Sequence, residues 1–305
     1  MKLAALLVPL LVLAGCGNAG AASDGRPSVV TAFYPLQFAS EFIGGDAVSV
    51  TDLTKPGAEP HDLELNPRQV AQISDAALVV YLKGFQPAVD EAVAQQAGDK
   101  AFDAGSAVEL MDVAHEDEGE HVPGEEEHAE AAGGKDPHVW LDPVRLATIG
   151  DRLGERLAQA DPEHAAGYQA RAAALHTELA ELDTEYATKL KTCARRDIVT
   201  SHTAFGYLAQ RYGLREVGIT GISPEAEPTP QRLAEVAQRA KETGTTTIFF
   251  ETLVSPKVAD TIAREVGART AVLDPVEGRT DPDTDYFSIM RANLTALTTA
   301  LGCKS

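Results

Sequence analysis

Residues 28–43 read SVVTAFYPLQFASEFI, an apolar run of strand length over 28–34 that passes directly into an amphipathic stretch of helical length over 35–43. The same alternation recurs along the chain. Strand-like runs lie at 47–53, 78–82, 197–201, 245–250 and 270–273, and helix-like stretches lie at 67–74, 204–212, 231–242, 257–266 and 286–301. Alternating strands and helices of these lengths indicate an α/β fold with mainly parallel sheets.

The two alternating halves are separated by residues 144–191, which are rich in Ala, Leu, Glu and Arg and contain one proline, Pro162. This composition favours a long helix, which the proline could interrupt near Asp161. We therefore expect an N-terminal α/β lobe over 28–142 and a C-terminal α/β lobe over 193–305. A long rigid connector helix within 143–192 joins them, and any ligand binds in the cleft between the lobes.

The chain has 305 residues, 44% of them hydrophobic, which is enough for one large or two medium globular domains. It carries 46 Asp and Glu against 26 Lys and Arg, a net charge of −20. Such a surface repels nucleic acid phosphates and anionic headgroups, which argues against a nucleic acid partner and is compatible with a cationic ligand.

The N-terminus has the pattern of a secretory signal peptide over 1–15: Lys2, an apolar run over 3–13, and small residues before Cys16. The run is shorter than the ~20 apolar residues that a membrane-spanning helix needs. The string LAGC at 13–16 resembles a bacterial lipobox, in which the new N-terminal cysteine is acylated. This predicts a lipid anchor at Cys16 on the extracytoplasmic face of the membrane, followed by a tether over 16–27. The alternative is a short signal with an incidental cysteine.

Two further cysteines, Cys193 and Cys303, are expected to form a disulfide, because a spare pair outside the cytosol usually oxidises. Two free thiols or a thiolate metal site are the alternatives. A bridge between them would close a loop of about 110 residues.

Residues 115–130 (HEDEGEHVPGEEEHAE) contain eight carboxylates and three histidines and no Lys or Arg. This composition predicts a mobile loop over 114–134 that cannot bury a core. The loop is either simply solvated or a weak collector of divalent metal. Its deletion is expected to leave any tight metal site in place.

Three of the eight histidines lie at junctions between predicted elements: His61 in a turn after a strand, His138 just before the connector, and His202 directly after a strand. The others lie in the acidic loop (115, 121 and 128) or in the connector (164 and 176). Ligands of open α/β sheets gather at the carboxyl ends of strands, so two facing lobes would bring the three junction imidazoles into one cleft. Three imidazoles make a site suited to zinc.

Several strings, in the right order, resemble the solute-binding proteins of zinc and manganese ABC transporters, and in particular their zinc uptake branch. They include FYPLQFASEFIGGD at 33–46, GAEPHDLELNPRQVAQISDAALVVYLKGFQP at 57–87, DPHVWLDP at 136–143, IVTSHTAFGYLAQRYGL at 198–214 and IFFETLVSPKVADTIAREVGA at 248–268. The resemblance implies two lobes bridged by a long helix, and His61, His138 and His202 as metal ligands. It also implies delivery of Zn(II) to a membrane permease and its ATPase. An acidic His-rich insertion before the second ligand is typical of the zinc branch.

A fourth ligand is expected from the family pattern near the start of the last helix, where Asp285 is our choice. Asp283, Glu59 or a water molecule are the alternatives. A manganese site would typically replace the third histidine with a carboxylate, and nitrogen-rich sites suit zinc, so the sequence favours zinc over manganese.

Catalysis is not expected, because the chain has no HExxH cluster, no GxSxG string and no phosphate-binding glycine-rich loop, and we assign no catalytic or organic-cofactor residue. The other functions considered are a manganese-binding homologue, a lipid-anchored surface adhesin and a metal chaperone. A carrier that presents one face to a permease is expected to be a monomer.

Overall fold

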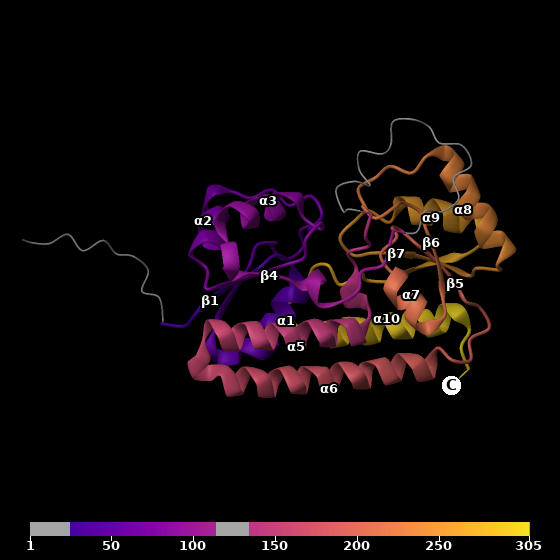
Figure 1. Cartoon of the computed structure of the whole chain (residues 1–305). Helices are drawn as coiled ribbons and strands as arrows, with labels where there is room; N and C mark the ends of the chain where they lie inside the picture. Colours follow the sequence, from indigo (N-terminus) through magenta and orange to yellow (C-terminus); the bar gives the residue numbers. More distant parts are fainter. Residues whose placement is uncertain (1–24, 114–133, 305) are drawn as a thin grey trace, which may run out of the picture.

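The computed structural model describes residues 25–113 and 134–304 and contains two four-stranded parallel sheets, one in each lobe (Figure 1). The first sheet has the order β2-β1-β3-β4. Its strands are β1 (Ser28–Thr31), β2 (Ser49–Asp52), β3 (Leu78–Tyr81) and β4 (Ala101–Asp103). The second sheet has the order β6-β5-β7-β8. Its strands are β5 (Asp197–Thr200), β6 (Arg215–Gly218), β7 (Thr247–Phe250) and β8 (Arg269–Val272). The expected α/β fold with two parallel-sheet lobes is confirmed.

The first lobe contains α1 (Tyr34–Gly44), α2 (Pro67–Asp75) and α3 (Pro87–Gln96), and the second contains α7 (Gly206–Tyr212), α8 (Pro230–Glu242), α9 (Lys257–Val266) and α10 (Tyr286–Leu301). Proline occupies the first turn of α1, α2, α3 and α8, where its missing N–H costs nothing. The sequence did not predict α3, β4 or β6. The two strands are short pieces at sheet edges, so they lack the apolar run of a central strand.

The connector is helical, as expected, and it divides where Asp161 and Pro162 allow. Its two long helices are α5 (Pro143–Ala160) and α6 (Ala165–Lys189), separated by the 3-10 turn η6 (Pro162–His164). They run antiparallel, and α6 extends beneath both lobes, alongside α5 and then α10 (Figure 1). Close packing of this hairpin requires a glycine, because a Cβ on Gly154 would lie 2.8 Å from the Cβ of Ala172.

One continuous core links the first lobe, the helical hairpin and α10, and a smaller core lies between the second sheet and the helices α8 and α9. Buried aromatic side chains link separate elements through hydrogen bonds of their polar atoms. The Trp140 indole donates to the carbonyl of Pro275 over 2.7 Å, and the Tyr286 hydroxyl donates to the carbonyl of Trp140 over 2.7 Å. These contacts tie the lobes and the connector into one packed unit.

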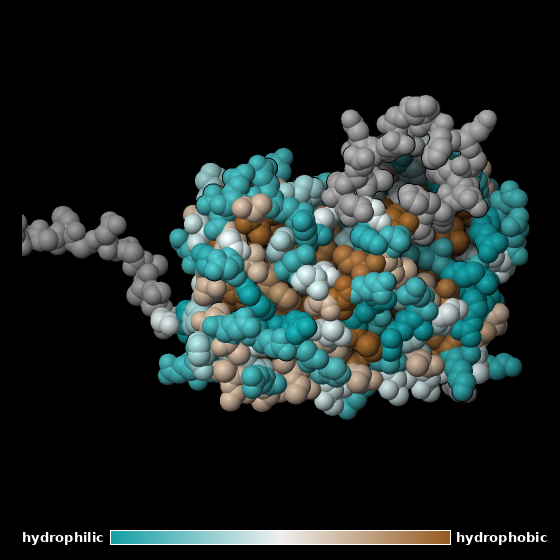
Figure 2. Space-filling model, in the orientation of Figure 1, coloured by the Kyte–Doolittle hydropathy of each residue, from teal (hydrophilic) through white to brown (hydrophobic). Residues whose placement is uncertain are grey.

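The expected disulfide is present between Cys193 and Cys303, where it joins the end of α10 to the start of the second lobe. No described helix has the length and apolarity needed to cross a membrane. Figure 2 shows hydrophilic residues over most of one face, with hydrophobic residues reaching the surface in patches near the middle of the molecule. Cys16 and the acidic loop lie outside the described residues.

Candidate metal site

His61 lies on the segment between β2 and α2, whose backbone is held at two points. The carbonyl of Pro60 accepts a hydrogen bond from the buried Gln86 side chain over 3.0 Å. The Glu59 carboxylate accepts from the backbone N–H of His61 over 2.8 Å. The imidazole packs edge-on against Phe85, with ring centroids 4.5 Å apart.

His138 immediately precedes the 3-10 turn η5 (Val139–Leu141), which leads into α5. Oδ1 of Asp136 accepts both the backbone N–H of His138, over 2.9 Å, and its ring Nδ1, over 2.8 Å. This pair of bonds fixes the ring with its Nε2 facing Glu277.

His202 follows β5 at the carboxyl edge of the second sheet, where the strand order reverses between β5 and β7. This is the position at which open α/β sheets bind ligands. Glu251, which directly follows β7, accepts from Nδ1 of His202 over 2.8 Å and from the Ser201 hydroxyl over 2.6 Å. The ring of His202 is therefore also fixed, with its Nε2 facing Glu277 and Nε2 of His138.

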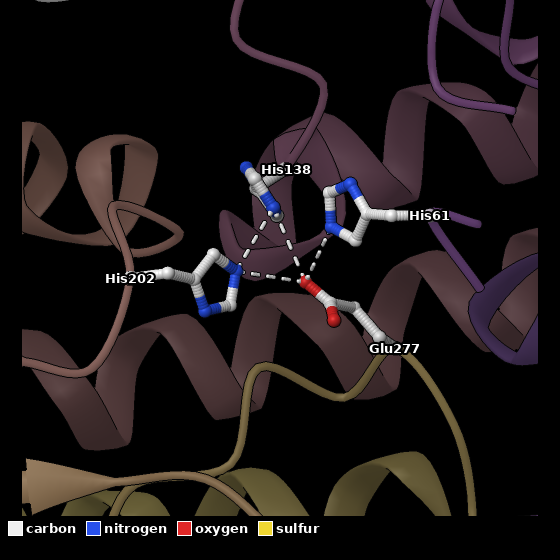
Figure 3. A group of neighbouring side chains, drawn as sticks. All are labelled: His61, His138, His202 and Glu277. Atoms are coloured by element: carbon white, nitrogen blue, oxygen red, sulfur yellow. Dashed lines mark hydrogen bonds and ion pairs between the residues drawn. The ribbon is translucent and has the colours of Figure 1, made fainter. Parts of the chain in front are cut away.

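Glu277 lies on the segment between β8 and α10, and its side chain points at all three rings (Figure 3). Its Oε1 is 3.2 Å from Nε2 of His138, 3.2 Å from Nε2 of His202 and 3.5 Å from Nε2 of His61. One ligand atom from each of the four residues lies within 4.8 Å of the others. Zinc with ligands at 2.0–2.1 Å in a tetrahedron requires ligand atoms about 3.3 Å apart, and the three distances from Oε1 of Glu277 are close to this value.

The structure brings the three predicted histidines together, but it does not bring Asp285 to them. Asp285 is the exposed N-cap of α10, where its carboxylate accepts from the backbone N–H of Ser288 over 2.7 Å. Asp283 is exposed as well. The carboxylate in the group is Glu277, which the sequence reasoning missed although it follows a predicted strand at 270–273, as a ligand at the carboxyl end of a strand would.

Glu59 lies beside the group without belonging to it. Burial, together with the nearby charge of Glu277, raises the pKa of the Glu59 carboxyl to about 8. His164 and His176 lie on the exposed surface of the connector, paired with Asp161 and Asp151, as expected for solvated residues.

The pKa values of the three imidazoles diverge. Burial opposes a charge on His138, but its hydrogen bonds to Asp136 and Glu277 outweigh burial and raise the pKa to about 9. Burial likewise opposes a charge on His202, but the carboxylates of Glu277 and Glu251 raise its pKa well above the ordinary value. The pKa of His61 is instead lowered by burial, which Glu277 offsets only in part.

Glu277 stays ionised in this setting. Its burial alone would raise the pKa, but the charge of His202 and the hydrogen bonds from the three rings hold the pKa well below the usual range. In the metal-free site, these shifts favour an ionised Glu277 beside protonated His138 and His202 rings. A divalent cation must displace protons to enter it.

The backbone before Glu277 adopts a strained conformation. Val276 has φ = 60°, the left-handed region, which a β-branched residue rarely occupies. The carboxylate of Asp274 accepts the Val276 N–H over 2.8 Å, and the Trp140 indole bonds to the carbonyl of Pro275. Strain of this kind persists where the surroundings enforce it and is common at functional sites.

A family model described as "Zinc-uptake complex component A periplasmic" (ZnuA) matches residues 29–300. The chain belongs to this family. It is 38% identical over 309 residues to the high-affinity zinc uptake system protein ZnuA of Bacillus subtilis, across 97% of this chain and 95% of that relative. It is 36% identical over 306 residues to the zinc-binding lipoprotein AdcA of Streptococcus pneumoniae, across 97% of this chain. The chain spans only 60% of the length of AdcA.

Among solved structures, the Zn(II)-bound ZnuA-like domain of Streptococcus pneumoniae AdcA superposes with a TM-score of 0.74 at 33% identity, covering 91% of this chain and 99% of that one. The resemblance found in the sequence is therefore confirmed, and the relatives favour the zinc branch over the manganese branch. The family is that of a transport component.

Proposed function

We propose that this protein is the extracytoplasmic zinc-binding component of an ABC importer, with His61, His138, His202 and Glu277 as the four ligands of Zn(II). The observation that carries the proposal is the convergence of three Nε2 atoms and one carboxylate oxygen at spacings that suit tetrahedral zinc. Zinc is the cargo, and the protein captures and releases it without a chemical reaction.

Binding follows from the arrangement of the ring nitrogens. Asp136 and Glu251 accept from Nδ1 of their histidines, which leaves the Nε2 lone pair available once its proton has left. The Glu277 carboxylate then supplies the fourth donor and offsets part of the charge of the metal. The side chains of His138 and Glu277 are 0% exposed, so these donors lie where bulk water is excluded.

The donor set bears on selectivity. Three nitrogens and one oxygen in a compact tetrahedron suit zinc, whereas manganese favours six ligands and more oxygen donors. We therefore expect zinc to displace manganese from the site at equal concentrations.

The partners follow from the family and from the N-terminus. A lipid anchor at Cys16 would hold the protein at the extracytoplasmic face of the membrane, and a permease with its ATPase would receive the zinc. The protein is expected to act there as a monomer.

Zinc uptake by cells tests this function. A strain that lacks the gene is expected to accumulate less radioactive zinc in chelator-treated medium, and the wild-type gene restores uptake. The Glu277→Ala variant is expected to fail although the protein is present at the membrane in normal amounts. Full restoration of uptake by this variant would refute the assigned site.

A further inference from the structure

The four residues of the site differ in how firmly they are held. The rings of His138 and His202 are each fixed at Nδ1 by a carboxylate, at 2.8 Å in both cases. Their side chains are 0% and 1% exposed. Each ring therefore has one defined orientation, because rotation would break a charge-assisted hydrogen bond in a buried place.

Glu277 is held by the backbone that carries it. The preceding Val276 is in a strained conformation that Asp274 stabilises. The backbone N–H of Asp274 donates to the Asn293 amide oxygen over 2.9 Å, and the Asn293 amide N–H donates to the carbonyl of Asp274 over 2.6 Å. Since the Glu277 side chain is also fully buried, it has little freedom to leave.

His61 lacks such an anchor. Within residues 25–113 and 134–304, no group forms a hydrogen bond with its Nδ1. Its side chain is 9% exposed, the largest value among the three rings. Its backbone is nevertheless fixed through Pro60 and Glu59, so the freedom belongs to the side chain and not to the segment.

We infer that His61 is the releasable ligand of the site: it closes on the zinc last and leaves first, by rotation of its side chain, while the other three ligands stay in place. The inference rests on the proposed zinc function. A carrier built in this way can open without separating its lobes, which the shared core and the connector hairpin hold together.

The consequence for transport is an ordered exchange. Rotation of one imidazole lowers the number of ligands from four to three and opens the solvent-facing side of the metal. The same three fixed ligands then form a partial site that first captures an incoming ion. Zinc would enter and leave on the side of His61.

Stopped-flow transfer of zinc to a fluorescent chelator tests the inference with the pair of variants His61→Gly and His202→Gly, each with and without millimolar imidazole. We expect His61→Gly to release zinc on the order of 100-fold faster than the wild type or more, because even loss of an outer partner of a ligand costs 10–100-fold in affinity. Free imidazole should reach this gap, which is less buried than the gap in His202→Gly, and slow the release at least tenfold. It should not slow the release from His202→Gly, whose gap is buried.

Equal rescue of both variants, or rescue of His202→Gly alone, would overturn the inference. A second measurement on the unmodified metal-free protein does not depend on the folding of any variant. In ¹⁵N imidazole spectra, His138 and His202 should each show an Nδ1 proton that is protected from solvent exchange, and His61 should show no protected Nδ1 proton. Equal protection of all three would also refute the inference. Failure of the wild type to bind zinc would instead refute the proposed function.

Discussion

The affinity for zinc should fall steeply between pH 8 and pH 6. In the metal-free protein, the pKa of His138 is raised to about 9 and that of His202 is raised well above its ordinary value, so protons on both rings compete with zinc in this window. The pKa of His61 is lowered and that of Glu277 stays well below the usual range. These two groups therefore contribute no proton at neutral pH.

The sign and size follow from proton competition. Zinc needs the Nε2 lone pairs, so at any pH below the raised pKa values two protons must leave before it binds. Each proton costs a factor of ten per pH unit, or about 1.4 kcal/mol. Two protons over two pH units predict a loss on the order of 10⁴-fold, about 5.5 kcal/mol. Ordinary imidazoles would lose affinity only below a pH of ~6.5.

Calorimetric zinc titration in two buffers of different ionisation enthalpy counts the released protons directly. We expect about two protons per zinc at pH 7. The Asp136→Asn variant should release fewer at that pH, because it removes the hydrogen bond that raises the pKa of His138. No proton release at pH 7, together with constant affinity from pH 8 to pH 7, would refute this account of the site.

Three further outcomes test the surroundings of the site. The Glu251→Gln variant should bind zinc about 10–100-fold more weakly in a chelator competition, since the variant loses the charge that holds one ring; unchanged affinity would contradict this. Replacing Cys193 and Cys303 together with serine should lower the free energy of unfolding in urea by about 4–5 kcal/mol without changing zinc affinity, and an unaltered urea midpoint would be the opposing result. Gly154→Ala should destabilise the connector hairpin by about 1–3 kcal/mol, and by more than Gly167→Ala, whose Cβ would meet only the end of the Arg171 side chain. Equal effects of the two alanines on the thermal midpoint would contradict the packing described for the hairpin.

Much of the fold is legible in the sequence because buried parallel strands such as β3 are continuous apolar runs, and because prolines and glycines mark the ends of helices. The edge strands β4 and β6 could not be predicted from the sequence, since neither has a full apolar pattern. The connector composition predicts helix, but only tertiary packing decides that the chain turns back at Asp161 and forms a hairpin.

The site, too, could be predicted from the sequence only in part. The three histidines could be found because each stands at a junction between elements. Glu277 could not be chosen over Asp285 from the sequence alone. The position of Glu277 depends on the turn at Val276 and on the hydrogen bond from Trp140 to Pro275. Trp140 and Pro275 are 135 residues apart in the chain, so the sequence pattern does not show this contact. The two Nδ1 partners also differ in how local they are. Asp136 is two residues from His138, whereas Glu251 is 49 residues from His202 and reaches it only through the fold.

The most direct test of the account is an equilibrium zinc titration of the soluble protein from residue 25 onward, at pH 7.5 and with manganese as competitor. It is paired with Glu277→Ala and Asp285→Ala. We predict one tight zinc site per chain that manganese does not displace, a large loss of affinity in Glu277→Ala, and wild-type affinity in Asp285→Ala. Loss of zinc binding in Asp285→Ala with full retention in Glu277→Ala would contradict the site described here.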